Sequence, residues 1–365
     1  RTFTTHSGMG TMEAGLTTVT HRGAVELEET IVFYYNLQHG TKFEPRDVLD
    51  LTPAEVAEAK PDLFHASPEC KNLSAAKKGR GIEPQDIAHA EKVAEIIREA
   101  RPPSVTVENV TDYFNTKLSG IIIEALIDAG YDYRIVNVNA ADYGAAQSRR
   151  RTFVQAVRKD VGSLPDLPEK SKPGDWYELL KDLIDSAPDS ELRGKKKGSL
   201  SWERARLDDM IEKGKLDPSK PIFTAGGSAQ REVTAASNAG NPSPTLLATA
   251  ASIPRILMPD GRIKRVTPRM MARLMGLSDD VKIPEAAVGE KDYIKKWGLA
   301  KTVLGNGIHT LHTRNLIEPV AEVAKRKRQA QESPATFVTP QEAAVTTVRK
   351  KSEAKKQSPQ KAVEP

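Results

Sequence analysis

Short apolar runs alternate with amphipathic stretches over the first 160 residues of the chain. Compact apolar runs bounded by Gly, Pro or Asp predict buried strands, and apolar positions three or four residues apart predict helices. The predicted strands are a run at Phe3 and residues 23–27, 47–49, 62–66, 104–108, 133–139 and 152–157; the predicted helices are residues 12–19, 29–37, 85–100 and 113–129, with a short one capped by Thr52. This alternation predicts an α/β fold on a doubly wound, mostly parallel, Rossmann-like sheet.

The pattern changes after Asp160, where proline-rich and charged segments replace the apolar runs. Residues 161–265 predict a small, loop-rich inserted domain. Helical periodicity returns at residues 267–276, and Leu304–Ile308 is predicted to open a final helix that runs to about residue 325. Residues 266–326 are therefore predicted to complete the first domain, residues 1–160. Residues 327–365 are rich in Gln, Glu, Ser, Pro and Lys and predict a disordered basic tail.

Positive charge is concentrated at the carboxyl end of the chain. From Lys325 to Pro365 ten Lys or Arg stand against four Glu, a net charge of +6, whereas the whole chain carries +5. The remainder is close to neutral, so any nucleic-acid-binding face must be local. No apolar run is long enough for a transmembrane helix, and the first residues lack the apolar core of a signal peptide. The single cysteine excludes an internal disulfide and fits a reducing cytoplasm.

That single cysteine, Cys70, follows the strand predicted at residues 62–66. Chemistry in α/β sheets lies at the carboxyl ends of the strands, where a thiol in a polar loop can face a ligand. A lone cysteine is more often a small buried apolar residue, and this segment alone favours that alternative. Glu108 and Asn109 end the next predicted strand, where Glu108, taken alone, is an ordinary strand-end acid.

Five motifs occur in the order typical of the cytosine-C5 DNA methyltransferase family, which the chain resembles from about residue 3 to residue 325. Their family counterparts are Pro-Pro-Cys-Gln, Glu-Asn-Val, Gln-x-Arg-x-Arg, Arg-Leu-x-Gly and Gly-Asn-Ser-Val. In this chain they are Pro68-Glu-Cys-Lys-Asn-Leu-Ser74, Glu108-Asn-Val110, Gln147-Ser-Arg-Arg-Arg151, Thr267 to Gly276 and Gly305-Asn-Gly307. Residues 161–265 lie where this family carries its target recognition domain.

The resemblance implies methyl transfer from S-adenosylmethionine to C5 of a cytosine that is flipped out of the duplex. The Cys70 thiolate would add to C6, because C5 is too weakly nucleophilic to accept a methyl group unaided. Glu108 would protonate N3, which requires a carboxyl with a raised pKa. Asn109 would fix the adjoining loop, and Arg149 and Arg151 would hold the base O2 atom and a nearby phosphate.

The same resemblance assigns the donor site and the DNA contacts. The residues expected to bind S-adenosylmethionine are His6, Gly8, Gly10, Glu26, Leu27, Asp47, Val48, Pro68, Asn306 and Gly307. Those expected to contact DNA are Lys77, Lys78, Arg80, Gln147, Arg269 and Arg273. No metal is expected, since His309 and His312 stand at helical spacing without carboxylate or thiol company.

Several positions depart from the family pattern. Thr4-Thr5-His6 replaces the usual Asp-Leu-Phe before the glycines, and Thr11 replaces the second glycine of the Gly-Gly pair. Gly307 stands where the family has serine. Beside Cys70, Glu69 replaces a proline and Lys71 a glutamine, and the charge of Lys71 would lower the pKa of the thiol.

Three functions are consistent with these residues. The large inserted region favours a DNA cytosine-C5 methyltransferase. An RNA or tRNA cytosine-C5 methyltransferase of the same fold is the second, and the third is an inactive DNA-binding decoy that lost donor binding through the changes around His6. The expected partner is double-stranded DNA, with either a cognate restriction endonuclease or none. We expect a monomer without membrane association, in the cytoplasm of a prokaryotic or phage-infected cell and associated with the nucleoid.

Overall fold

The computed structural model describes residues 1–69, 81–192, 202–228, 233–248, 254–283 and 290–332. Arg1–Lys325 form one compact unit and Arg326–Pro365 another.

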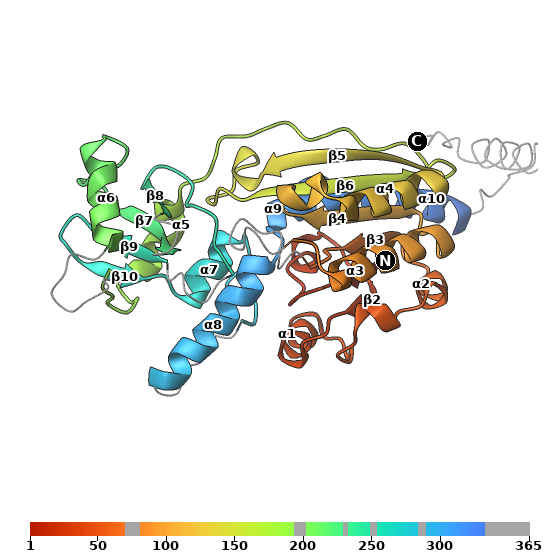
Figure 1. The fold of residues 1–365 in the computed structure, drawn as a ribbon, viewed down its shortest axis with the longest axis horizontal. Coiled ribbons are helices and arrows are strands. Elements are labelled where there is room, and N and C mark those ends of the chain that lie inside the picture. Colours follow the sequence, from red (N-terminus) through yellow and green to blue (C-terminus); the bar gives the residue numbers. More distant parts are fainter. Residues whose placement is uncertain (70–80, 193–201, 229–232, 249–253, 284–289, 333–365) are drawn as a thin grey trace, which may run out of the picture. The chain divides into compact units, whose positions relative to one another are not determined.

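The first unit contains a six-stranded sheet in the order β2-β1-β3-β4-β6-β5 (Figure 1). Its strands are β1 (Thr2–Thr5), β2 (His21–Val25), β3 (Leu63–Ala66), β4 (Ser104–Asn109), β5 (Tyr131–Asn139) and β6 (Arg150–Arg158). Strands β2, β1, β3 and β4 pair in parallel, and β6 is antiparallel to β4 and β5. The predicted mostly parallel α/β fold is confirmed.

Apolar side chains cover both faces of this sheet. Because successive side chains of a strand point to opposite faces, Phe64 and Leu63 enter different cores. Phe64 packs in one cluster with residues of α3 (Pro84–Glu99) and α4 (Lys117–Asp128). Leu63 packs in another with residues of the π-helical turn η6 (Thr313–Ile317). The other helices of this part are α1 (Glu29–His39), α2 (Pro53–Ala59), α9 (Thr310–His312) and α10 (Glu318–Glu332), and the short 3-10 turns are η1 (Glu13–Gly15), η2 (Val48–Asp50), η4 (Thr111–Asn115) and η5 (Ala140–Asp142).

The region predicted as an insertion carries a second sheet. Four antiparallel strands in the order β10-β9-β7-β8 form it: β7 (Ile222–Ser228), β8 (Val233–Asn238), β9 (Arg255–Leu257) and β10 (Ile263–Arg265). Helices α5 (Trp176–Ile184) and α6 (Trp202–Glu212) belong to the same stretch of chain. The indole of Trp176 packs against Phe223 of β7, and both belong to an apolar cluster that includes Met270 of α7 (Pro268–Leu274). The domain boundaries taken from the sequence stay predictions.

Three local expectations need correction. The expected strand end at residues 47–49 is the turn η2, because the Asp47 carboxylate accepts the Leu49 amide (2.9 Å) and caps it. The expected helix at residues 12–19 is the short turn η1, since Leu16 is already extended. Residue Leu304 lies near the end of α8 (Glu290–Asn306), and the next helical stretch begins at Thr310. Among the described residues, no helix combines the length and apolarity needed to span a membrane.

Candidate active site

The carboxyl ends of β3 and β4 meet at one edge of the large sheet, because these strands are parallel neighbours with Ala66 opposite Val107. The Asn109 side chain connects the two ends. Its Nδ2 donates to the Pro68 carbonyl (2.8 Å) and its Oδ1 accepts the Val110 amide (2.8 Å). The loop that leads to Cys70 is therefore held by the strand end that carries Glu108. Cys70 itself lies outside the described residues, as do Lys77, Lys78 and Arg80.

Glu108 is a buried carboxyl with a different partner on each oxygen. Its side chain forms an ion pair through Oε1 with Arg151 Nε (2.9 Å), and its Oε2 accepts a hydrogen bond from the Ser67 hydroxyl (3.2 Å). Burial raises the pKa of Glu108, and Arg151 and Arg149 act against that rise. Burial is the largest effect because a desolvated carboxylate loses its hydration. Such a group can hold and release a proton close to a bound base.

Gln147 and Arg149 are fully buried and join distant segments. Arg149 Nη2 donates to the carbonyls of Gly305 (2.8 Å) and Gly307 (2.6 Å). Gln147 Nε2 donates to the Leu274 carbonyl (3.1 Å) at the end of α7. In this structure both side chains therefore tie the third motif to the last two. Their predicted contacts with the base and with DNA stay untested.

The predicted donor site lies at the carboxyl ends of β1 and β2. The Glu26 carboxylate accepts the backbone amides of Gly8 (3.0 Å), Leu27 (3.0 Å) and Glu28 (3.3 Å). Burial raises the pKa of Glu26, and the charge of Glu69 adds to the rise. Glu69 follows Pro68, so a charge in the loop before Cys70 acts on the same acid.

The surface around Glu26 suits a nucleoside, with groups for both the ribose and a face of the base. Gly8 adopts a left-handed φ of +56°, and a Cβ there would meet nothing within 4 Å. Leu27 is 56% exposed, although it is a large apolar residue. The Arg46 amide donates to the Glu26 carbonyl (2.8 Å), which brings the neighbouring Asp47 toward this end of β2. An acid for ribose hydroxyls, open backbone and an exposed aliphatic face fit S-adenosylmethionine.

The remaining predicted donor residues occupy varied settings. His6 has a left-handed φ of +54°, and its ring centroid lies 5.2 Å from that of His89 on α3. The Gly10 carbonyl contacts His39 Nε2 (3.1 Å) at the end of α1, where a side chain on Gly10 would collide with that ring. Val48 is buried. Asn306 is exposed at the last position of α8.

Two departures from the family pattern touch each other. A Cβ on Gly307 would lie 2.6 Å from Thr11 Oγ1 and 2.9 Å from Thr11 Cγ2. The Thr11 hydroxyl also accepts the Ile308 amide (2.9 Å) in the interior. The space that a side chain at position 307 would need is thus filled by Thr11.

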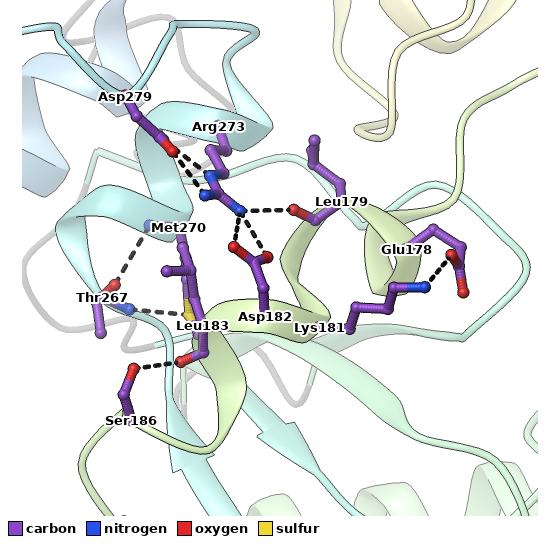
Figure 2. A network of polar contacts seen from close by, with 10 residues as sticks. All are labelled: Glu178, Leu179, Lys181, Asp182, Leu183, Ser186, Thr267, Met270, Arg273 and Asp279. Carbon is purple, nitrogen blue, oxygen red and sulfur yellow. Dashed lines mark hydrogen bonds and ion pairs between the residues drawn. The ribbon is translucent and has the colours of Figure 1, made fainter.

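Arg273 and Arg269, both predicted to contact DNA, are engaged within the protein. Arg273 lies between two carboxylates, with Nη1 2.7 Å from Asp182 and Nη2 2.6 Å from Asp279 (Figure 2). Hydrogen bonds from Asp279 and Asp182 raise the pKa of the Arg273 guanidinium. Arg269 donates through Nη2 to the Val281 carbonyl (3.1 Å). These bonds brace α7, and the predicted contacts with DNA stay untested.

Sequence reasoning did not single out Ser67, which contacts Glu108, or His65, which contacts Ser67. Ser67 directly precedes Pro68, and its position after a buried strand was the signal available. Because side chains alternate along a strand, His65 lies on the face of the sheet opposite to Phe64 and Ala66. The part of the chain that the structure describes contains no group of three or more His, Cys, Asp or Glu suited to a metal ion.

Comparison with known sequences identifies the family. The family model described as C-5 cytosine-specific DNA methylase matches residues 1–318. The type II methyltransferase M.FnuDI of Fusobacterium nucleatum is 31% identical over 197 residues, which cover 52% of this chain and 54% of that protein. M.HhaI of Haemophilus parahaemolyticus is 25% identical over 231 residues, covering 61% of this chain and 67% of that protein. The chain spans about half the length of M.FnuDI and of M.MthTI of Methanothermobacter thermautotrophicus.

Comparison with solved structures supports the fold. A methyltransferase encoded within an E. coli prophage superposes with a TM-score of 0.61 at 18% identity, covering 90% of this chain and 99% of that one. The Entamoeba histolytica methyltransferase EhMeth superposes with a TM-score of 0.56 at 14% identity, covering 88% of this chain and 97% of that one. At these identities the likeness shows the fold alone. Because the family model matches residues 1–318 of its 365 residues, the chain belongs to the C-5 cytosine-specific DNA methylase family.

Proposed function

We propose that this chain transfers a methyl group from S-adenosylmethionine to C5 of cytosine in double-stranded DNA. One observation carries the proposal: the strand end with the buried Glu108 is hydrogen-bonded to the loop that precedes Cys70. The Asn109 side chain donates to the Pro68 carbonyl, and the Ser67 hydroxyl donates to the Glu108 carboxyl. A buried acid beside the approach to the chain's single thiol is the arrangement that nucleophilic catalysis on a pyrimidine requires.

In the proposed reaction the Cys70 thiolate forms a bond to C6 of a flipped cytosine while Glu108 gives a proton to N3. The ring then holds an enamine whose C5 is nucleophilic. S-adenosylmethionine, when bound, supplies the electrophilic methyl group that C5 accepts. A base removes the proton from C5. The S–C6 bond then breaks as the C5–C6 double bond re-forms, the N3 proton returns to Glu108, and the thiolate leaves. The donor departs as S-adenosylhomocysteine. Arg151, already 2.9 Å from Glu108, is the cation proposed to meet the base O2 atom.

The proposed ligands follow the arrangement of the strand ends. Glu26 would hold the ribose hydroxyls of the donor, and Leu27 would pack on its purine. Arg149 is proposed to act by holding the carbonyls beside Asn306 rather than by touching substrate. We propose that the protein works as a monomer in a prokaryotic cytoplasm, on DNA, with a cognate restriction endonuclease or without one.

A duplex carrying 5-fluorocytosine at the target position tests this proposal. Thiolate addition and methyl transfer can proceed on it, but fluorine cannot leave as a cation, so the enzyme stays attached. With donor present, the adduct should survive denaturing electrophoresis and map to Cys70. Cys70→Ser should abolish it, because a hydroxyl is scarcely ionised near neutral pH. An adduct that forms equally well in Cys70→Ser would overturn the mechanism, since the chain has no other cysteine.

A further inference from the structure

A chain of hydrogen bonds leads from the interior of the large sheet to Glu108. His65, on β3, contacts Thr106 Oγ1 of β4 through Nδ1 (2.8 Å) and Ser67 Oγ through Nε2 (3.0 Å). The Ser67 hydroxyl then donates to Glu108 Oε2 (3.2 Å). His65 is 3% exposed and Thr106 is fully buried, so water does not compete for these bonds. None of these three side chains is proposed to touch the substrate.

The charge of Glu108 determines which group donates in each of these hydrogen bonds. A carboxylate only accepts hydrogen bonds, so Ser67 must donate its single hydroxyl proton to it. Ser67 Oγ can then only accept from His65, which fixes the imidazole hydrogen on Nε2. His65 Nδ1 is left as the acceptor for the Thr106 hydroxyl. Burial lowers the pKa of His65 to about 3, so the ring is neutral and supplies no competing charge.

We propose that His65 and Ser67 are positioning residues that make Glu108 an effective proton donor by stabilising the carboxylate it becomes. This inference rests on the proposed function of Glu108. When Glu108 gives its proton to N3, negative charge forms on a buried group. A hydroxyl already directed at Oε2 by His65 meets that charge without reorganisation.

The other groups facing Glu108 act differently. Arg151 and Arg149, both contributed by the β6 side, lower the pKa of Glu108 through their charge. Arg151 is also proposed to meet the base, so its contact with Oε1 changes when substrate enters. Ser67 approaches the opposite oxygen from β3, and it is the partner expected to remain throughout the cycle. His65 reaches Glu108 only through this hydroxyl.

Single-turnover methylation, measured against pH with saturating DNA and donor, tests the inference on the full-length protein. The wild-type rate should fall at high pH as Glu108 loses its proton. Ser67→Ala removes the donor to Oε2, so the pKa of Glu108 should rise and the falling limb should move up by about one pH unit. The maximal rate should drop because Glu108 becomes a weaker acid. Ser67→Thr keeps the hydroxyl and is the matched control, expected to follow the wild type.

His65 variants separate positioning from packing. His65→Gln keeps a donor near the Nε2 position and should retain the wild-type pH profile, whereas His65→Leu should shift it in the direction of Ser67→Ala. The KM for DNA should stay unchanged in every variant, since none of these side chains is proposed to touch DNA. Thermal melting identifies a variant that fails to fold, and Ser67→Ala, the smallest change, then carries the test.

Two results would overturn the inference. One is a Ser67→Ala rate reduced by the same factor at every pH, which indicates a purely structural role. The other is a Ser67→Ala profile identical to that of the wild type. Failure of the proposed function is distinct, because the wild-type protein would then neither methylate DNA nor form an adduct with 5-fluorocytosine DNA.

Discussion

The contact between Thr11 and Gly307 predicts that substitutions at these two positions are strongly coupled. Gly307→Ser restores the residue typical of the family but places a Cβ 2.6 Å from Thr11 Oγ1, closer than non-bonded atoms tolerate. Thr11 is 4% exposed and cannot move aside freely. Overpacking of this kind costs about 1–3 kcal/mol. Thr11→Gly alone leaves the Ile308 amide without its acceptor at 2.9 Å, at a cost of about 1–3 kcal/mol.

The double variant should be more stable than the sum of the single changes implies, because Thr11→Gly removes the atoms that the introduced serine side chain would strike. Urea unfolding of the four proteins measures this coupling, which we expect at about 1–2 kcal/mol. Gly298→Ser is the matched control, because it adds the same side chain within α8, the helix that Gly307 follows. A Cβ at position 298 meets nothing within 4 Å. It should not destabilise the protein. Additivity within about 0.5 kcal/mol would show that the two positions do not share this space.

Three further predictions concern the site and its surroundings. Glu108→Gln should slow adduct formation with 5-fluorocytosine DNA strongly while leaving DNA binding in a gel-shift assay unchanged, and an unaltered trapping rate would exclude Glu108 as the proton donor. Glu26→Ala should weaken S-adenosylmethionine binding by about 1–3 kcal/mol in calorimetry, through lost ribose hydrogen bonds; equal affinity would place the donor elsewhere. Burial lowers the pKa of His65 and of His309 to about 3, so below pH 6.5 the unfolded chain binds more protons. Stability should therefore be full above pH 6.5 and fall toward pH 3, by about 2 kcal/mol per histidine at pH 5, and a pH-independent urea midpoint would contradict this.

The position of the site was accessible from the sequence because it depends on strand order and direction. Parallel strands bring their carboxyl ends to one edge, so a motif after β3 and a motif at the end of β4 had to become neighbours. The bond from Asn109 to Pro68 is a consequence of that geometry. The pattern of apolar runs was sufficient here, because each of these strands is short and buried on both faces.

The partners of two of the predicted functional cations were not accessible from the sequence. Arg273 finds Asp182, 91 positions away, and Arg149 finds the Gly305 carbonyl, 156 positions away. A sequence shows a cation in a basic motif but not the carbonyl or carboxylate that folding brings to it. The same limit applies to α5 and α6, whose stretch of chain is broken by prolines and charged runs that weaken the helical pattern.

The departures around the first motif have a different meaning once their contacts are known. Thr4 stands where the family has aspartate, but its hydroxyl donates to the buried Glu13 carboxylate (2.8 Å), which also accepts from Tyr35 (3.0 Å). An acid is thus present within hydrogen-bond reach of Thr4, contributed by a different position. Thr11 in turn occupies the space left by Gly307. Each change, taken alone, suggests a damaged donor site, whereas in contact each has a neighbour that compensates for it. The hypothesis of an inactive decoy is then left to depend on Thr5 and His6, and the His6 ring is already packed beside His89.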